Sequence, residues 1–254
     1  MDIILFIRYQ RKEKIKMKTI GLVFADDMEY APFLQWAKAQ GGEEKIIKKC
    51  NSVETVIGDG DRRLRLVAVE CGIGKVNAAA ATAFLIECEK ADYIFNAGLS
   101  GAVHGLKRED MVVLTSCVEC DFDLTAIGYE PGVKPDGQKY IYENDENFIG
   151  YALMSPGIIK AKSGTGDIFL TDKSRKDFYR ETFSIDCFDM ETAAIAAVCY
   201  KCDVPMLSLR KISDDADDSS VEDYREMNSR QESCLTELLC NIFTRIMQDD
   251  EQWN

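Results

Sequence analysis

The sequence holds one histidine, His104, and this scarcity excludes several kinds of site. A metal centre built from several histidine ligands is excluded, because the ligands are missing. A serine or cysteine nucleophile activated by a histidine base would have to rely on His104, which no neighbouring motif supports. We expect His104 to be a structural residue.

Long hydrophobic runs and internal linkers are also lacking. The longest unbroken apolar run, Ala193 to Tyr200, is far shorter than the roughly 18 residues that suggest a membrane span. No stretch rich in proline, glycine or serine, and no run of like charge, divides the 254 residues. With 46% hydrophobic and 30% charged residues, the chain can bury one large core. These features predict a single soluble globular domain without a membrane partner.

Positive charge is in short supply, with 31 Lys and Arg against 44 Asp and Glu and a net charge of −13. A surface this anionic disfavours nucleic acid as a partner. Residues 1–16 are the exception, because basic side chains outnumber acidic ones there. They lack a basic leader before their apolar run and a small-residue cleavage site after it, so they do not match a secretory signal. We interpret residues 1–16 as an N-terminal extension and residues 17–254 as the domain.

Cysteine is abundant, with ten residues and no export signal, which favours reduced thiols in the cytoplasm. Two CxxC pairs, Cys117/Cys120 and Cys199/Cys202, leave a four-thiolate zinc site open as an alternative. One pair ends a strand-like run and the other ends a helical run, and their spacing is not that of a zinc ribbon or finger. Buried free thiols are the favoured interpretation, and we expect no metal and no cofactor.

Short apolar runs alternate with helical patterns along the chain, which predicts a layered α/β fold. Two of the strand-like runs flank the turn residues 58–61 and predict a hairpin, so the sheet should be mixed. We expect three layers, with helices on both faces of the sheet. Helices are predicted from Phe33 and Asn77, over the alanine-rich run from Ala193, and as one long amphipathic helix from Val221 onward, with a polar gap around Arg230. The predicted strands cover residues 20–24, 53–57, 64–69, 93–96, 111–115, 158–163 and 206–212.

Unusual residues follow four of the predicted strands. In open α/β sheets ligands bind beyond the carboxyl ends of the strands, so these positions are candidate walls of a site. Gly98 to Gly101 is interpreted as a small-residue loop that a ligand can approach. The candidates are Asp26, Asp27 and Glu29, then Gly98 to Gly101, then Asp167 and Phe169, and last Ser213 and Asp214.

Two carboxylates surround Met190 at the start of the alanine-rich helix, and they allow two interpretations. Asp189 can cap the helix, with Glu191 as a favourable acid in its first turn. Alternatively, Met190 and Glu191 face a ligand, and the carboxylate of Glu191 holds the hydroxyls of a sugar. The sequence leaves both open.

Seven stretches, in this order, resemble the 5'-methylthioadenosine/S-adenosylhomocysteine nucleosidases, which share a nucleoside phosphorylase-like fold. The resemblance covers residues 19 to 247. Each stretch is short, but seven in one order form a specific pattern. They are residues 21–29, 72–76, 96–98 with Gly101, 124–129, 166–169, 190–191 and 210–214.

The resemblance implies hydrolysis of the bond between adenine and ribose in 5'-methylthioadenosine, S-adenosylhomocysteine or a related nucleoside. Asp214 matches the acid that protonates or hydrogen-bonds purine N7, and Glu29 matches the carboxylate that activates water. Glu191 would hold the ribose hydroxyls, with Met190 against the sugar, and Phe169 would stack on the purine. The substrate-binding residues are then Gly98, Leu99, Phe169, Leu170 with its backbone groups, Met190, Glu191 and Arg210.

The resemblance also implies a homodimer, because in this family a neighbouring subunit helps to build the alkylthio pocket. Two alternatives remain. A purine nucleoside phosphorylase would need donors for phosphate; the acidic stretch 26–29 opposes this, while Arg210 is a candidate anion ligand. A nucleoside-binding protein without turnover is the other. The chain departs from the family at Asp26, at Leu99 and Ser100, and at Cys120, which leaves the preferred 5' substituent open.

Overall fold

The computed structural model describes residues 17–135, 140–217 and 220–253, so the predicted extension, residues 1–16, lies outside the described residues. Ten strands form one sheet. They are β1 (Lys18–Phe24), β2 (Glu43–Ile47), β3 (Cys50–Asp59), β4 (Arg62–Glu70), β5 (Tyr93–Ala102), β6 (Met111–Glu119), β7 (Ile141–Glu143), β8 (Ile158–Thr165), β9 (Cys187–Asp189) and β10 (Met206–Asp214).

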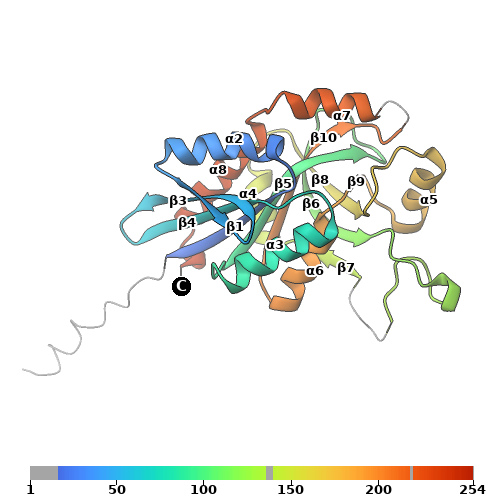
Figure 1. Cartoon of the computed structure of the whole chain (residues 1–254), viewed down its shortest axis with the longest axis horizontal. Coiled ribbons are helices and arrows are strands. Elements are labelled where there is room, and N and C mark those ends of the chain that lie inside the picture. The colour runs from blue at the N-terminus through green and yellow to red at the C-terminus, as the bar shows by residue number, and fades with distance from the viewer. Residues whose placement is uncertain (1–16, 136–139, 218–219, 254) are drawn as a thin grey trace, which may run out of the picture.

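Helices cover both faces of this sheet, as the three-layer prediction requires (Figure 1). Side chains of β1 alternate between the two faces: Leu22 and Phe24 belong to one core, and Val23 to the other. The first core includes side chains from α2, α4 and α8, and the second includes side chains from α3 and α6. The described helices are α2 (Asp27–Ala39), α3 (Lys75–Glu87), α4 (Glu146–Leu153), α5 (Lys173–Phe183), α6 (Thr192–Cys202), α7 (Ser220–Ser229) and α8 (Cys234–Gln248).

The sheet is mixed, and the predicted hairpin is confirmed. β3 pairs antiparallel with β4 across a turn at residues 60–61, while β1 is parallel to both β4 and β5. One half of the sheet closes on itself, because β10 pairs with both β5 and β6, and β8 and β9 complete the ring. Small and branched side chains fill the interior of this ring: Ala102, Val112, Leu114, Ala161, Cys187 and Ile212.

Two expectations about local structure are wrong. Gly98 to Gly101 is not a loop but part of β5, where Gly98 pairs with Arg210 of β10 and Gly101 pairs with Phe188 of β9. The predicted long C-terminal helix is two helices, α7 and α8, separated at residues 230–233. Gln231 has a positive φ of 47° there, a backbone conformation that a helix cannot continue through.

No helix in the described ranges combines the length and the apolar character needed to cross a membrane. The first strand, the central strand and the last strand, which are β1, β5 and β10, run parallel to one another. Their carboxyl ends therefore meet at one edge of the sheet, where the chain leaves each strand. This edge is where the candidate site lies.

Candidate active site

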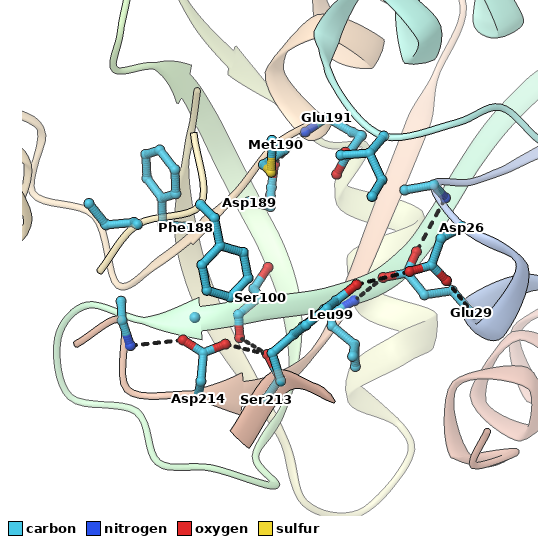
Figure 2. Close-up of a pocket in the computed structure, with 17 residues that line it drawn as sticks. Asp26, Glu29, Leu99, Ser100, Phe188, Asp189, Met190, Glu191, Ser213 and Asp214 are labelled. Carbon is cyan, nitrogen blue, oxygen red and sulfur yellow. Dashed lines mark hydrogen bonds between the residues drawn. The ribbon is translucent and has the colours of Figure 1, made fainter. Parts of the chain in front are cut away.

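A pocket lies at the carboxyl ends of β1, β5 and β10 (Figure 2). It brings together residues from both halves of the chain, including Glu29 and Asp214. Of the predicted site residues, Asp27, Gly98, Asp167 and Arg210 do not line the pocket. The Asp167 carboxylate accepts a hydrogen bond from the backbone of Lys75 instead. The residues that line it are Ala25, Asp26, Glu29, Ile73, Leu99, Ser100, Gly101, Phe169, Leu170, Phe188, Asp189, Met190, Glu191, Ser213, Asp214, Ala216 and Tyr224.

Glu29 is held in the first turn of α2 by backbone donors. Asp26 caps this helix, and its Oδ1 accepts hydrogen bonds from the amides of Met28 and Glu29 at 2.9 Å. The Glu29 carboxylate accepts from the amide of Leu99 at 2.7 Å and from the amide of Ala25 at 3.2 Å. The carboxylate is therefore fixed between the end of β1 and the middle of β5.

The surroundings of Glu29 make it an unusually strong base for a carboxylate. Burial, and next the negative charge of Asp26, raise its pKa to about 8, although the nearby Arg210 opposes the rise. A carboxylate with a pKa near neutrality can accept a proton from water far more readily than an exposed glutamate can. The first turn of α2 thus presents a candidate general base to the pocket.

Asp214 occupies the other end of the pocket and is 3% exposed. The pairing of β10 with β5 shifts register between Ile212 and Asp214, and a bulge of this kind turns a side chain out of its regular direction. The Asp214 carboxylate accepts from the Ser213 hydroxyl at 2.6 Å and from the Ala216 amide at 2.9 Å. Burial raises its pKa above the usual range despite these hydrogen bonds, which favours the protonated, donating form.

Two glycines of β5 make room for these two carboxylates. A Cβ at Gly98 would lie 2.7 Å from Glu29 Oε1, and a Cβ at Gly101 would lie 2.8 Å from Asp214 Oδ1. Any larger residue at either position would displace a carboxylate. Because strand residues rise by about 3.3 Å each, the α-carbons of the two glycines lie roughly 10 Å apart along the strand. Gly98 itself does not line the pocket; it lies beneath Glu29.

Glu191 lines a third side of the pocket, at the start of α6. Its Oε1 accepts from the amide of Gly74 at 2.9 Å. Gly74 has a φ of 99°, so a glycine is needed for the loop before α3 to reach this carboxylate. Burial, and next the charge of Asp189, raise the pKa of Glu191 to about 7. The second of the two interpretations, a carboxylate that faces a ligand, fits Glu191.

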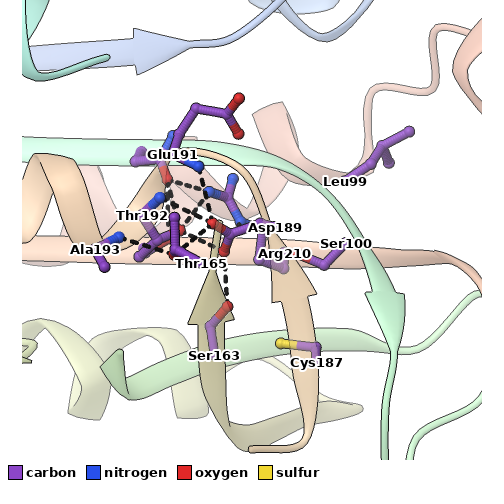
Figure 3. Close-up of polar contacts among 12 residues, drawn as sticks. Leu99, Ser100, Ser163, Thr165, Cys187, Asp189, Glu191, Thr192, Ala193 and Arg210 are labelled. Carbon is purple, nitrogen blue, oxygen red and sulfur yellow. Dashed lines mark hydrogen bonds and ion pairs between the residues drawn. The ribbon is translucent and has the colours of Figure 1, made fainter. Parts of the chain in front are cut away.

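The first interpretation, helix capping, fits Asp189. Its Oδ1 accepts from the amides of Glu191 and Thr192 at 3.0 and 2.9 Å, and Oδ2 accepts from the hydroxyls of Ser163 and Thr192 at 2.7 and 2.6 Å (Figure 3). Arg210 Nε lies 3.4 Å from the same carboxylate. Burial alone would raise the pKa of Asp189, but Arg210 and these donors hold it below its usual range. Asp189 is therefore an ionised anchor rather than a proton donor.

Arg210 lies beneath the pocket rather than on its wall, and only 2% of it is exposed. Its guanidinium also donates to Asn96 Oδ1 and to the Thr192 hydroxyl. A Cβ at Gly98 would lie 2.8 Å from Arg210 Nη1, so the guanidinium reaches the same spot as the Glu29 carboxylate. This buried cation thus lies among the carboxylates of the site.

Aromatic side chains form the outer part of the pocket. Phe169 is 42% exposed, and its ring lies edge-on to that of Tyr224, with centroids 5.4 Å apart. Leu170 and Phe188 are buried beside it. Neither Tyr224 nor Phe188 is among the predicted site residues, yet both line the pocket. No spacing in the sequence marks Tyr224, because it reaches the pocket through the packing of α7 against β10.

The CxxC pairs do not gather into a metal site. All ten cysteines are within the described residues and free, and nowhere in the described ranges do three His, Cys, Asp or Glu side chains lie close enough to hold a metal ion. Cys117, Cys120 and Cys199 are buried, and burial raises the pKa of each thiol, so all three stay protonated. They behave as small apolar residues of the core.

Comparison with known proteins places this architecture in a family. The model of the phosphorylase superfamily matches residues 19–244. A 5'-methylthioadenosine/S-adenosylhomocysteine nucleosidase of Bacillus velezensis is 33% identical over 240 residues, which are 91% of this chain and all of the relative. One of Geobacillus sp. is 32% identical over 219 residues, 83% of this chain and 92% of the relative. A solved nucleosidase structure of this name from Helicobacter pylori has a TM-score of 0.84 and 25% identity, with 90% of this chain and 99% of that chain covered.

The fold and the matching residues make the chain a member of the phosphorylase superfamily. Within it, the chain belongs to the 5'-methylthioadenosine/S-adenosylhomocysteine nucleosidase family, because these relatives match most of its length at more than 30% identity.

The raised pKa of Glu29 predicts a pH dependence of stability that Glu29→Gln removes. The pKa of Glu29 is about 8 in the folded state and 4.5 ordinarily. Between these pH values the folded chain keeps a proton on Glu29 that the unfolded chain has released. The wild type therefore loses stability between pH 4.5 and 8, at up to about 1.4 kcal/mol for each pH unit. We expect the free energy of unfolding, measured with urea, to fall less for Glu29→Gln than for the wild type as pH rises across this window.

The control is Glu87→Gln, at an exposed position near the end of α3. It should leave the wild-type profile unchanged. Parallel profiles for the wild type and Glu29→Gln would contradict the raised pKa.

Proposed function

We propose that this protein hydrolyses the N-glycosidic bond of 5'-methylthioadenosine, S-adenosylhomocysteine or a related adenine nucleoside and releases adenine. The observation that carries the proposal is that Glu29 and Asp214 line one pocket, over the two glycines of β5. Two carboxyls with raised pKa values, held apart, suit a reaction in which one end donates a proton and the other accepts one. The named relatives support the same reaction.

Asp214 acts on the leaving group. As the glycosidic bond breaks, the electron pair goes to the purine, which gains negative charge. A protonated Asp214 donates to N7 and stabilises that charge, and burial raises the pKa of its carboxyl. Phe169 stacks on the purine, and the backbone of Leu170 hydrogen-bonds its edge.

Glu29 acts on the water. The sugar becomes positively charged as the purine leaves, and the attacking oxygen must lose a proton to form the product. Glu29, held by the amides of Leu99 and Ala25, accepts that proton near the anomeric carbon. In its ionised form, the negative charge of Glu29 also stabilises the cationic sugar.

The remaining residues position the ribose. Glu191 accepts hydrogen bonds from the ribose hydroxyls, and Met190 packs against the sugar. Gly98 contributes by making room for Glu29, and Leu99 contributes its amide. Arg210 acts from below, because its charge favours the ionised forms of Glu29 and Glu191.

Hydrolysis suits the pocket better than phosphorolysis. The residues that line the pocket in the described chain include five carboxyls, those of Asp26, Glu29, Asp189, Glu191 and Asp214, and no Lys or Arg. The guanidinium of Arg210 is buried beneath Gly98 and paired with Asp189. A phosphate dianion would meet uncompensated negative charge here, whereas water would not.

The assembly and location that we propose follow the same family. A single domain over residues 17–254 forms a cytoplasmic homodimer with a role in methionine salvage. Ten free cysteines favour a reducing compartment. Exposed apolar side chains, among them Ile73, Val76 and Ile127, suit a subunit interface.

The proposed reaction predicts adenine release that does not depend on phosphate. We expect equal rates from 5'-methylthioadenosine in phosphate-free buffer and in buffer with added phosphate, followed by chromatography of adenine and of the sugar product. The sugar product should be free 5-methylthioribose. A strict requirement for phosphate, with a sugar 1-phosphate as product, would support the phosphorylase alternative instead.

Asp214→Asn should lower kcat by about 10² to 10⁴ with a small change in KM, because an amide cannot protonate the leaving purine. The matched control is Asp215→Asn, which changes the exposed acid next to it. Steady-state adenine release at saturating nucleoside measures both. A wild-type kcat in Asp214→Asn would remove Asp214 from the mechanism.

A further inference from the structure

Asp26 and Tyr224 line the pocket, and the proposed reaction gives neither a role. Asp26 precedes α2 and Tyr224 lies on α7, so the hydrogen bond between them joins two helices. The Tyr224 hydroxyl lies 2.9 Å from Asp26 Oδ2, and the Tyr224 ring contacts the ring of Phe169. Tyr224 therefore reaches from the aromatic wall of the pocket to the carboxylate of Asp26.

The direction of this hydrogen bond is fixed by its partners. A carboxylate accepts but cannot donate, so the single proton of the Tyr224 hydroxyl points to Asp26. The other Asp26 acceptor sites are occupied by the amides of Met28 and Glu29 and by Asn228 Nδ2 at 3.1 Å. Asn228 Nδ2 also donates to the Tyr224 oxygen at 3.3 Å. One lone pair of that oxygen remains, and it can only accept.

The hydroxyl keeps its proton throughout the neutral range. Burial, and next the negative charges of Asp26 and Glu29, raise the pKa of Tyr224 above its usual value. The group presented to a ligand is thus a neutral hydroxyl with its proton engaged. Such a group pairs with a hydrogen-bond donor and leaves an acceptor or an alkyl group unmatched.

Stereochemistry brings the 5' substituent of a nucleoside to this side of the pocket. The base and the 5' carbon leave the same face of the ribose ring, and the 2' and 3' hydroxyls leave the opposite face. With the purine on Phe169 and the hydroxyls on Glu191, the 5' substituent lies on the Phe169 side of the sugar. Tyr224 is the side chain there, packed on the ring of Phe169.

We propose that Tyr224, with its proton held by Asp26, makes the site favour, among related adenine nucleosides, those whose 5' substituent donates a hydrogen bond, such as a hydroxyl or an ammonium group, over those that end in an alkyl group. This inference rests on the proposed function, because the positions of purine and ribose set the direction of the 5' carbon. Asp26 and Tyr224 are specificity-determining residues, and they take no part in bond cleavage.

Three nucleosides that differ only at the 5' position test the proposal. The 5' carbon is a methyl group in 5'-deoxyadenosine, and it carries a hydroxyl in adenosine and an amino group in 5'-amino-5'-deoxyadenosine. We expect the wild-type kcat/KM to favour adenosine over 5'-deoxyadenosine by at least about tenfold, because a polar site left unpaired discriminates strongly. In Tyr224→Phe, which keeps the ring on Phe169, the ratio should fall towards one through a loss for adenosine alone.

Two further variants sharpen the test. In Asp26→Asn the amide can donate to the Tyr224 oxygen, which frees the tyrosine proton, so the preference for donors should also fall. Tyr200→Phe, at an exposed position on α6 away from the pocket, should leave the wild-type ratio unchanged. Dissociation constants for the three nucleosides, measured by calorimetry in the Asp214→Asn background with and without Tyr224→Phe, report the same preference without turnover.

Equal kcat/KM and equal dissociation constants for the hydroxyl and methyl nucleosides would overturn the proposal, as would a preference that survives Tyr224→Phe. A preference for the hydroxyl in the dissociation constants that Tyr224→Phe abolishes, together with no adenine release from any nucleoside, would support the subsite and contradict the proposed hydrolysis. The two claims therefore fail separately.

Discussion

The site depends on one buried guanidinium. Arg210 lies under the pocket among Glu29, Asp189 and Glu191, and it is the buried cation that these carboxylates share. Burying a charge without a partner costs several kcal/mol, so Arg210 and Asp189 stabilise the fold only as a pair with their hydrogen-bond donors. The charge of Arg210 keeps Asp189 ionised. Asp189 then caps α6 and fixes Glu191 at the pocket wall. Asp189 therefore caps the helix, and Glu191, two residues further along the chain, faces the pocket.

The central strand turns this electrostatic arrangement into a geometry for catalysis. Gly98 and Gly101 of β5 leave space for a carboxylate from α2 and another from β10. Because the strand is paired on both sides, the spacing between the two acids is held by the sheet and not by a loop. Catalytic groups on a rigid frame suit a reaction whose two proton transfers occur at fixed points on one small molecule.

The sequence predicts much of this because motifs at strand ends are local. The runs before Asp26 and from Tyr93 predict strands. Acids after the first run and small residues after the second predict a site where parallel strands end. The closure of the sheet by β10 pairing with both β5 and β6 could not be predicted, since strand neighbours are a property of the whole fold. For the same reason small residues at 98–101 suggested a loop. The position of Tyr224 in the pocket could not be predicted, because nothing in the local sequence of an amphipathic helix indicates which tyrosine faces a pocket.

The central claim is that one nucleoside lies between Glu29 and Asp214, with its base at the Asp214 end. A crystal structure of the Asp214→Asn variant with a bound adenine nucleoside tests it most directly. The purine should lie on Phe169 with N7 at hydrogen-bond distance from the side chain at position 214, and an ordered water should lie between the anomeric carbon and Glu29. A base bound at the Glu29 end, or a nucleoside bound outside this pocket, would contradict the claim.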